Sequence, residues 1–185
     1  MKEILTEIVS GSIDYTRQGK VADYIPGLAV DEQVYLSEKA TGSKNRALAY
    51  MMKAYGMISD DVEEVLEYYF RACSIRVTAE DLVRIGLVFA NGGKLPGTER
   101  PLFDKKFCQY INAVLITSGM YDGSGEFALN VGVPAKSGVG GGFMAVVPGK
   151  MGIGIYSPAL DRKGNSVAGI KALEQLSSNL ELSIF

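Results

Sequence analysis

A lysine and a serine stand directly ahead of a run of glycines where the chain enters an apolar segment. Lys136 and Ser137 are followed by Gly138, and three more glycines precede the apolar run 143–147. A lysine in such a place stabilises the ionised form of a neighbouring hydroxyl and lowers its pKa. Glycines let backbone N–H groups approach a ligand closely, as an oxyanion hole requires. The pattern indicates acyl-transfer chemistry, with a glycine-rich entry to a hairpin as the alternative.

Four other polar and aromatic residues are candidates for contact with a small ligand. Glu38 and Asn45 lie seven residues apart where a helix over 45–55 is expected to begin, so both could border one pocket. A solvated glutamate and a helix-capping asparagine are the alternative. Tyr69 falls on the stripe of an amphipathic helix, where a core aromatic is the alternative to a ligand contact. Tyr121 follows a predicted helix in a loop rich in glycine and serine, which indicates a ligand contact.

The absence of histidine restricts the chemistry of the chain. Ser-His-Asp and Cys-His mechanisms are excluded, and a zinc site is not expected. No Gly-x-x-x-x-Gly-Lys-Ser/Thr string occurs, which argues against a nucleotide phosphate site. Proton transfer would have to use lysine, tyrosine or carboxylate groups, and the sequence predicts neither a metal nor another cofactor.

The composition favours one globular domain over residues 1–185, with 47% hydrophobic residues and a net charge of −2. That charge offers no basic surface for nucleic acid. No apolar run approaches the ~20 residues that span a bilayer, and the first residues do not begin a secretory signal, so no membrane partner is expected. Cys73 and Cys108 lie in predicted helices, which predicts reduced core thiols in a cytoplasmic protein, with a disulfide as the alternative.

Apolar residues at helical spacing predict six helices. They are expected over residues 2–12, 45–55, 61–73, 79–90, 103–117 and 165–180. Asp60 and Glu63 have the spacing of a capping box. Thr78 and Asp81 have the same spacing before the next helix. Asn165 is expected to cap the last helix.

Two strands are predicted near the glycine run. Residues 143–147 and 151–156 have strand character, and a hairpin at 148–150 joins them. Gly152 and Gly154 in the second strand indicate that a helix packs closely on that face. Helices on a small antiparallel sheet make an α+β fold.

Long motifs along nearly the whole chain resemble, in order, those of the serine-dependent, β-lactamase-like glutaminases. They include Ser-Glu-Lys-Ala-Thr-Gly at 37–42 and Tyr-Phe-Arg-Ala-Cys-Ser at 69–74. The other matching segments are 19–26, 45–50, 90–93, 118–127, 134–142, 147–151 and 164–169. The resemblance implies a β-lactamase/transpeptidase-like (DD-peptidase-like) fold. It also implies hydrolysis of the side-chain amide of L-glutamine to L-glutamate and ammonia.

The resemblance implies roles for single residues in binding the substrate. Glu38 would face the α-ammonium group, and Asn45 would be a second substrate-binding residue. Tyr69 would contact the substrate near the nucleophile and is a candidate for proton transfer to the leaving ammonia. Tyr121 would be a further substrate contact.

Two residues of the glycine run would complete the catalytic site. Lys136 would be the lysine of the Lys-Ser-Gly strand, and Val139 would contribute its backbone N–H to the oxyanion hole. In the family, a serine activated by a lysine attacks the amide, ammonia leaves, and water hydrolyses the acyl-enzyme.

A central segment of the family has no counterpart in this chain. Residues 29–31 directly join two motifs that family members separate by a long segment, so a deletion junction is expected there. That segment would hold the nucleophile motif Ser-x-x-Lys, and no Ser-x-x-Lys occurs in the 185 residues. Thr41 and Lys44 have similar spacing but lie inside the substrate-binding motif. The chain alone is therefore expected to be inactive.

Three functions are compatible with these observations. The leading hypothesis is an L-glutaminase without its nucleophile-bearing segment. A non-catalytic glutamine- or glutamate-binding or assembly module derived from a glutaminase is the alternative. A related penicillin-recognising hydrolase is disfavoured, because 37–50 and 119–127 match glutaminases more closely. The resemblance implies L-glutamine and L-glutamate as ligands and a homotetramer as the assembly.

Overall fold

The computed structural model describes residue 25 and residues 27–185. The helix expected over 2–12 lies outside the described residues. The chain divides into two compact units, residues 1–76 and 77–185, and each has helices, strands and a buried core of its own. The expectation of one domain over 1–185 stays a prediction, because separate cores can still unfold together.

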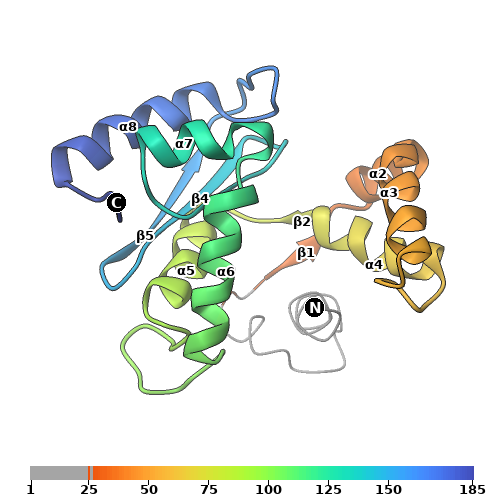
Figure 1. The fold of residues 1–185 in the computed structure, drawn as a ribbon, viewed down its shortest axis with the longest axis horizontal. Coiled ribbons are helices and arrows are strands. Elements are labelled where there is room, and N and C mark those ends of the chain that lie inside the picture. Colours follow the sequence, from red (N-terminus) through yellow and green to blue (C-terminus); the bar gives the residue numbers. More distant parts are fainter. Residues whose placement is uncertain (1–24, 26) are drawn as a thin grey trace. The chain divides into compact units, whose positions relative to one another are not determined.

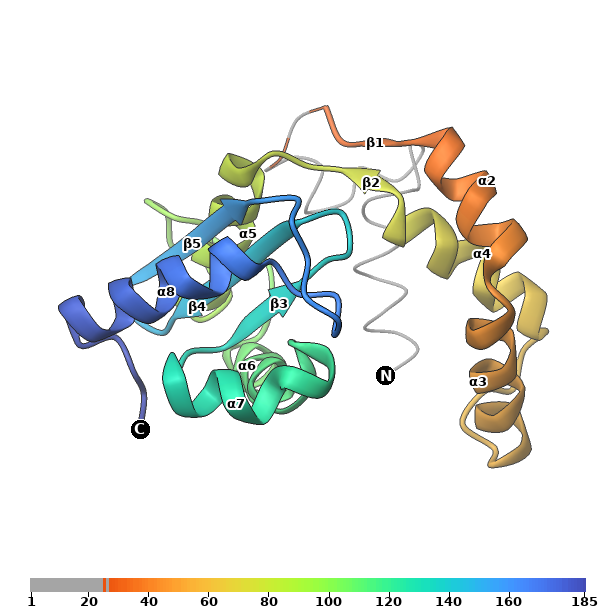
Figure 2. The ribbon, with the colours of Figure 1, turned by 90° about the horizontal axis from the view of Figure 1, so that it is seen from above.

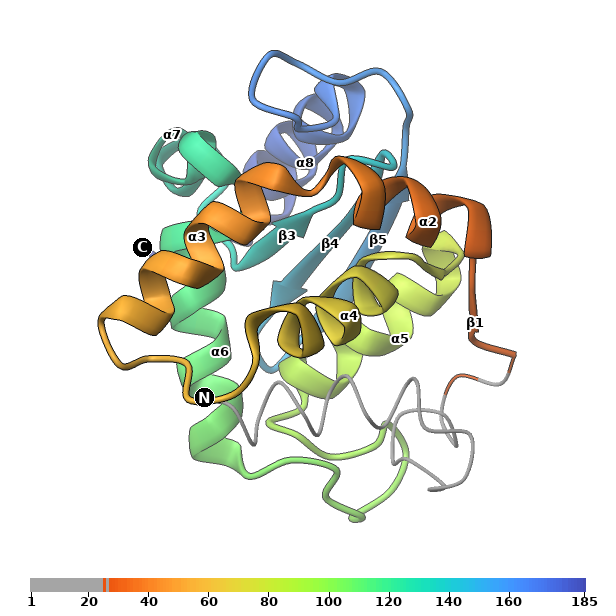
Figure 3. The same cartoon turned by 90° about the vertical axis from the view of Figure 1, so that its right-hand side faces the viewer.

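The first unit consists of three helices and a two-stranded antiparallel ladder. Its elements are β1 (Ala29–Val30), α2 (Glu32–Thr41), α3 (Ser43–Ala54), α4 (Val62–Cys73) and β2 (Ile75–Arg76). Helix α4 lies alongside α2 and α3 (Figure 3). Val62, Leu66 and Phe70 form the buried stripe of α4 and pack against Tyr35 of α2 and Ala49 of α3. Burial of this stripe therefore holds the three helices together.

Helix α2 was not expected from the sequence, because Tyr35 is the one residue that it buries and it therefore lacks an apolar stripe. Asp31 caps α2, since its carboxylate accepts hydrogen bonds from two backbone N–H groups of the first turn. Gly42 separates α2 from α3. A Cβ atom at Gly42 would lie 2.7 Å from Cε1 of Phe70, so the ring occupies the space of a side chain.

The start of α4 differs from the expectation. Asp61 caps the helix, and the expected box of Asp60 and Glu63 does not form. The Asp61 carboxylate accepts hydrogen bonds from the N–H groups of Glu63 and Glu64 at 3.0 and 3.1 Å. The Glu63 carboxylate binds Arg46 instead, so it does not reach back to the helix start.

The second unit is a three-stranded antiparallel sheet between helices. Its elements are α5 (Ala79–Ala90), α6 (Lys105–Ser118), the 3-10 helix η1 (Tyr121–Gly123), α7 (Ser124–Asn130), β3 (Ala135–Ser137), β4 (Gly142–Val147), β5 (Met151–Tyr156) and α8 (Val167–Leu180). The strand order is β3–β4–β5. Helix α8 covers one face of the sheet and α5 the other (Figures 1 and 2).

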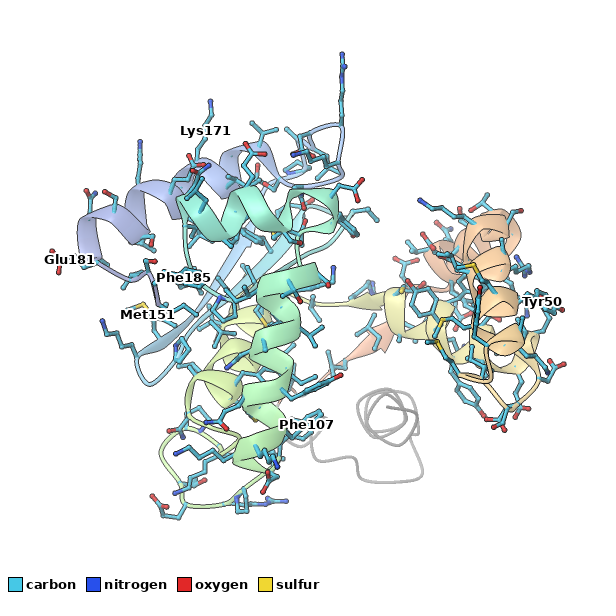
Figure 4. All side chains as sticks on the ribbon, in the orientation of Figure 1. Tyr50, Phe107, Met151, Lys171, Glu181 and Phe185 are labelled. Carbon is cyan, nitrogen blue, oxygen red and sulfur yellow. The ribbon has the colours of Figure 1, made fainter. Side chains whose placement is uncertain are left out.

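The central strand β4 is buried on both faces. Phe143, Ala145 and Val147 pack with residues of α7 and α8. Met144 and Val146 pack with residues of α5 and α6, among them Phe107, which projects from α6 (Figure 4). A strand with two buried faces reads as a continuous apolar run, and this explains why the sequence predicted it.

The two glycines of β5 lie against α5, as expected. A Cβ atom at Gly152 would lie 2.5 Å from the Val83 carbonyl oxygen and 2.6 Å from the Leu87 nitrogen. A Cβ atom at Gly154 would lie 3.0 Å from the Val83 nitrogen. The isoleucines of β5 pack on the opposite face, with α8. Alternation of glycine and isoleucine therefore brings the α5 backbone close to the sheet.

One predicted helix cap is confirmed and another is wrong. The Thr78 hydroxyl accepts from the Asp81 N–H at 3.1 Å, and the Asp81 carboxylate accepts from the Thr78 N–H at 2.9 Å. Ser166, not Asn165, caps α8. The Asn165 side chain is buried and donates to the Met120 carbonyl oxygen at 3.1 Å, so it is used in a long-range contact.

The cysteines fit the expectation of core thiols in part. Both are thiols, and Cys108 is buried, whereas Cys73 is exposed because it is the last residue of α4 and extends past the core. Helix α6 begins at Lys105, two residues later than expected, because Asp104 caps it. Within residues 27–185, no helix is long and apolar enough to cross a bilayer.

Candidate functional site

The six predicted site residues divide between the two units. Those of the first unit lie on three helices, α2, α3 and α4, and are Glu38, Asn45 and Tyr69. Those of the second unit lie on η1, on β3 and in the turn after β3, and are Tyr121, Lys136 and Val139. In the second unit the three residues lie together in one cluster. In the first unit they lie on three helices that meet where the Phe70 ring packs on Gly42.

Lys136 and Tyr121 are in contact. The Lys136 Nζ lies 4.7 Å from the centre of the Tyr121 ring, within cation–π range. The same ammonium group donates a hydrogen bond to the Ser137 carbonyl oxygen. Tyr121 has a φ of +51°, which is uncommon for a residue other than glycine. The Ser124 hydroxyl holds this conformation, because it accepts from the Met120 N–H at 3.0 Å and donates to the Tyr121 carbonyl at 2.8 Å.

Ser137 does not share the face of Lys136. Side chains alternate along a strand, and β3 buries Ala135 and Ser137 but exposes Lys136. The buried Ser137 hydroxyl has no hydrogen-bond partner among the described residues. The group beside the Lys136 ammonium is therefore Tyr121, and not the serine that follows it in the sequence.

Val139 lies in the turn between β3 and β4. The Gly138 N–H donates to the Gly142 carbonyl, and the Gly141 N–H donates to the Gly138 carbonyl, both at 2.9 Å. Gly141 has a φ of +89°, which favours glycine. Val139 is 64% exposed, and its N–H donates to no acceptor in the part of the chain that the structure describes. An exposed N–H in a fixed turn is the donor that an oxyanion hole needs.

Gly164 lies beside both Tyr121 and Val139. A Cβ atom at Gly164 would lie 3.6 Å from the Tyr121 Cε2 and 3.7 Å from the Val139 Cγ1. The loop before α8 therefore completes the cluster of Tyr121, Lys136 and Val139. Sequence reasoning gave Gly164 no role in the site, although it begins the matching motif 164–169.

The candidates of the first unit lie around one packing contact. Gly42 joins the helix of Glu38 to the helix of Asn45, and the Phe70 ring packs on it. Tyr69 precedes Phe70, is 47% exposed, and meets the Phe70 ring edge-on at 5.9 Å. Glu38 and Asn45 are half-buried. No ion pair forms to Glu38 among the described residues, so its carboxylate is available to a cationic ligand group.

Arg46 links all three helices of the first unit. Its NH1 donates to the Lys39 carbonyl oxygen on α2 at 2.9 Å, and its Nε donates to the Glu63 carboxylate on α4 at 3.0 Å. Its guanidinium carbon lies 5.5 Å from the centre of the Phe70 ring. The sequence analysis did not single out Arg46. The one feature of the sequence that pointed to it is its place beside Asn45 in a motif that matches the family.

Comparison with protein families matches residues 20–185 to the family described as Glutaminase. This chain belongs to the glutaminase family. A glutaminase from Alkaliphilus oremlandii (strain OhILAs) is 52% identical over 187 residues, which cover 98% of this chain and 61% of the relative. A glutaminase from Clostridium tetani (strain Massachusetts / E88) is 52% identical over 179 residues, which cover 97% of this chain and 58% of the relative. The chain thus spans about three-fifths of these curated glutaminases.

Solved structures, glutaminases among them, resemble this fold. One is the covalent complex of the Bacillus subtilis glutaminase YbgJ with 5-oxo-L-norleucine, formed by reaction with 6-diazo-5-oxo-L-norleucine. It has a TM-score of 0.84 and 41% identity, over 89% of this chain and 59% of that chain. Another is Mglu in its glutamate form, with a TM-score of 0.83 and 37% identity over 89% of this chain and 38% of that one. The expected α+β, β-lactamase-like fold is therefore confirmed.

The family assignment leaves two expectations as predictions. The roles of the six site residues rest on the resemblance and on the geometry described above. The missing central segment, with its junction near 29–31, likewise stays a prediction.

Among the described residues, no group of three or more histidine, cysteine, aspartate or glutamate side chains could hold a metal ion.

Proposed function

We propose that this chain supplies the substrate-binding and amide-activating residues of an L-glutaminase, and that it binds L-glutamine or L-glutamate. The observation that carries the proposal is the cluster after β3, where Lys136 contacts Tyr121 beside the available N–H of Val139. Membership of the glutaminase family supports it. The 5-oxo-L-norleucine complex of the Bacillus subtilis relative and the glutamate form of Mglu also support it.

Each of the two charged groups on the α-carbon of the amino acid has a suitable partner among the candidate residues. The half-buried Glu38 would accept the α-ammonium group, because its carboxylate has no other cation among the described residues. Asn45 carries an amide donor for the α-carboxylate. The family resemblance implies a ligand contact for Tyr121, whose ring lies against Lys136 and Gly164 within the second unit. The charge of Glu38 and the amide of Asn45 would thus both recognise the α-carbon end of glutamine.

The proposed reaction is acyl transfer. A serine hydroxyl gives its proton to a lysine as its oxygen forms a bond to the amide carbon, and the carbonyl oxygen becomes an oxyanion that the Val139 N–H stabilises. The carbon–nitrogen bond breaks as Tyr69 donates a proton and ammonia leaves, and the lysine returns its proton to Tyr69. Water then hydrolyses the ester and releases L-glutamate. The 185 residues contain no Ser-x-x-Lys to provide the attacking serine, so this chain alone binds the ligand without turnover.

A non-catalytic glutamine- or glutamate-binding module is the second candidate function, and the same absence of Ser-x-x-Lys favours it. The two candidates differ at residues 29–31. A gene that encodes a further segment between these codons would support the hydrolase. An intact junction in the genome, with the protein expressed at this length, would support the binding module.

Two measurements on the purified chain test the proposal. Titration calorimetry should detect binding of L-glutamate, and Glu38→Gln should weaken it by about 1–3 kcal/mol because a charge-assisted bond is lost. Glu64→Gln, an exposed change of the same charge on α4, is the control. A coupled ammonia assay with L-glutamine should detect no turnover. The absence of any binding would overturn the proposal, and turnover of roughly 1–1,000 per second would show that the nucleophile is present.

We also infer a cytoplasmic location and a homotetrameric assembly. The thiol state of both cysteines supports the first inference, because disulfides form in oxidising compartments. The family resemblance supports the second. Light scattering coupled to size exclusion would measure the assembly, and a monomer at all concentrations would contradict the tetramer.

A further inference from the structure

Four side chains with no role in the proposed site meet between α2 and α4. Tyr35 and Lys39 lie one turn apart on α2, and Glu67 and Arg71 lie one turn apart on α4. We call these four residues the α2–α4 clamp. The Glu67 carboxylate is at its centre, because it accepts hydrogen bonds from the other three.

The contacts of Glu67 are short and come from both helices. Its carboxylate lies 2.5 Å from the Tyr35 hydroxyl, 2.8 Å from the Lys39 Nζ and 2.9 Å from the Arg71 Nε. The Arg71 guanidinium also lies 4.3 Å from the centre of the Tyr35 ring. Tyr35 is 4% exposed, so the network reaches from the solvent-accessible ends of the charged residues into the core of the first unit.

The clamp residues bracket the candidate ligand contacts along the chain. Glu38 lies directly before Lys39 on α2, and Tyr69 lies midway between Glu67 and Arg71 on α4. A helix is nearly rigid over one turn. Contacts among the clamp residues therefore fix the rotation of α2 about its axis, and its axial position along α4, close to Glu38 and Tyr69.

We propose that Glu67 is a positioning residue, which holds α2 on α4 so that Glu38 and Tyr69 keep the relative placement that an L-glutamate ligand requires. The inference rests on the proposed ligand-binding function and adds a residue that does not touch the ligand.

The physical properties of the clamp favour positioning over bulk stability. Lys39, followed by Tyr35, holds the pKa of Glu67 at about 2, below its usual 4.5, so the carboxylate is ionised at neutral pH. The charged ends of Lys39 and Arg71 remain partly exposed. Ion pairs of this kind contribute little to the free energy of unfolding. Directional bonds to one carboxylate nevertheless restrict the sliding of two helices.

The test compares ligand affinity with stability in the full chain. Glu67→Gln, which removes the charge, and Tyr35→Phe, which removes one hydroxyl from an intact core ring, should each weaken L-glutamate binding about tenfold, as a loss of about 1.4 kcal/mol would do. Thermal midpoints should fall by only about 2–4 °C. Glu64→Gln, an exposed change of the same charge on α4, should alter neither value. Affinity within twofold of the natural chain for both test variants would overturn the proposal.

A second comparison separates action through Glu38 from a general structural effect. In a Glu38→Gln background, Glu67→Gln should weaken binding less than it does in the natural chain, because the contact that it positions is already lost. An equal further loss in both backgrounds would overturn the proposal.

A structural measurement keeps this inference distinct from the proposed function. Nuclear Overhauser contacts between the Tyr35 ring and the Arg71 side chain report the clamp directly. They should be lost in Glu67→Gln and retained in Glu64→Gln. If the natural chain binds no L-glutamate, the proposed function fails, and these contacts still decide whether Glu67 holds α2 on α4. Their loss would support the clamp, and their persistence in Glu67→Gln would overturn it.

Discussion

A strained tyrosine and an available backbone donor lie together after β3. Tyr121 is held at a φ of +51°, and a conformation of this kind costs on the order of 1–3 kcal/mol. Two hydrogen bonds of the Ser124 hydroxyl, to the Met120 N–H and the Tyr121 carbonyl, offset this cost. Gly119, just before this segment, lets the chain pass close to β3, because a Cβ atom there would lie 3.0 Å from the Ala135 carbonyl carbon. The position of the ring is therefore set by packing and not by local preference.

Two substitutions at Val139 separate its N–H from its side chain. Val139→Pro removes the N–H, so L-glutamate binding should weaken by about 1–3 kcal/mol. Val139→Ala keeps the N–H, and the exposed side chain contributes little, so binding should change by less than about 0.5 kcal/mol. Calorimetry on both variants measures the difference, with thermal melts as the folding control. Equal affinities would mean that the turn after β3 is only a hairpin entrance.

At the scale of elements, α5 and β5 fit together through small residues. Gly86 of α5 lies opposite Gly152 of β5, since a Cβ atom at Gly86 would lie 3.1 Å from the Gly152 Cα. Backbone therefore packs on backbone, and neither element has space for an added methyl group.

Gly152→Ala should lower the free energy of unfolding by about 1–3 kcal/mol, because the new methyl group overlaps the backbone of α5. Gly125→Ala on α7 is the matched control, since no heavy atom lies within 4 Å of its Cβ position. That change should raise the free energy by about 0.5–1 kcal/mol, because alanine loses less backbone entropy in a helix. Urea unfolding measures both. A neutral Gly152→Ala would show that α5 can move away from the sheet.

The contact between α2 and α4 should weaken in acid. The pKa of Glu67 is lowered from 4.5 to about 2 in the folded chain by Lys39, then Tyr35, and the other groups that face it are Arg71 and, through Arg71, Glu32. A lowered pKa contributes stability above pH 4.5 that is lost as the pH falls toward 2. The difference in the free energy of unfolding between the natural chain and Glu67→Gln should therefore shrink across that range. A difference that is constant from pH 7 to pH 2 would contradict this assignment.

Elements with their own local signals were predicted from the sequence, and elements made by distant contacts were not. The periodicity and the box of Thr78 and Asp81 gave α5 with both ends correct. Helix α2 was missed, because its place depends on Tyr35 and on charged contacts with α4. Asn165 resembles a helix cap locally, but a carbonyl group 45 positions away binds its side chain. For the same reason, motifs identified Lys136 and Val139, whereas the contacts of Gly164 and Arg46 required the structure.

At the scale of the whole molecule, the parts of the two units that the structure describes differ in the size of their buried clusters. Among the described residues of the first unit, the buried cluster has five members. The second unit has two clusters of ten and five buried residues on the two faces of its sheet. The first unit also leaves large apolar side chains in solvent, such as Tyr50 on α3, which is 55% exposed (Figure 4). Less buried apolar area gives a smaller driving force for folding.

Native-state hydrogen exchange should therefore divide the chain. Amides of α2 to α4 should exchange at least about tenfold faster than those of β4 and α5, because opening the first unit exposes less apolar surface. Mass spectrometry of peptides from each unit measures this difference. Equal opening free energies in both units would instead support one cooperative domain over residues 1–185.

Because one cysteine is buried and the other exposed, alkylation of the two thiols can report on unfolding of the chain. Alkylation requires a thiolate, and burial, with a smaller effect of Asp104, raises the pKa of the Cys108 thiol to about 11. Cys73 is exposed at the end of α4. Iodoacetamide at pH 8 should therefore add one label to the folded protein, at Cys73. A second label should appear only when the second unit opens, so the mass of the intact chain would record that opening without any introduced probe.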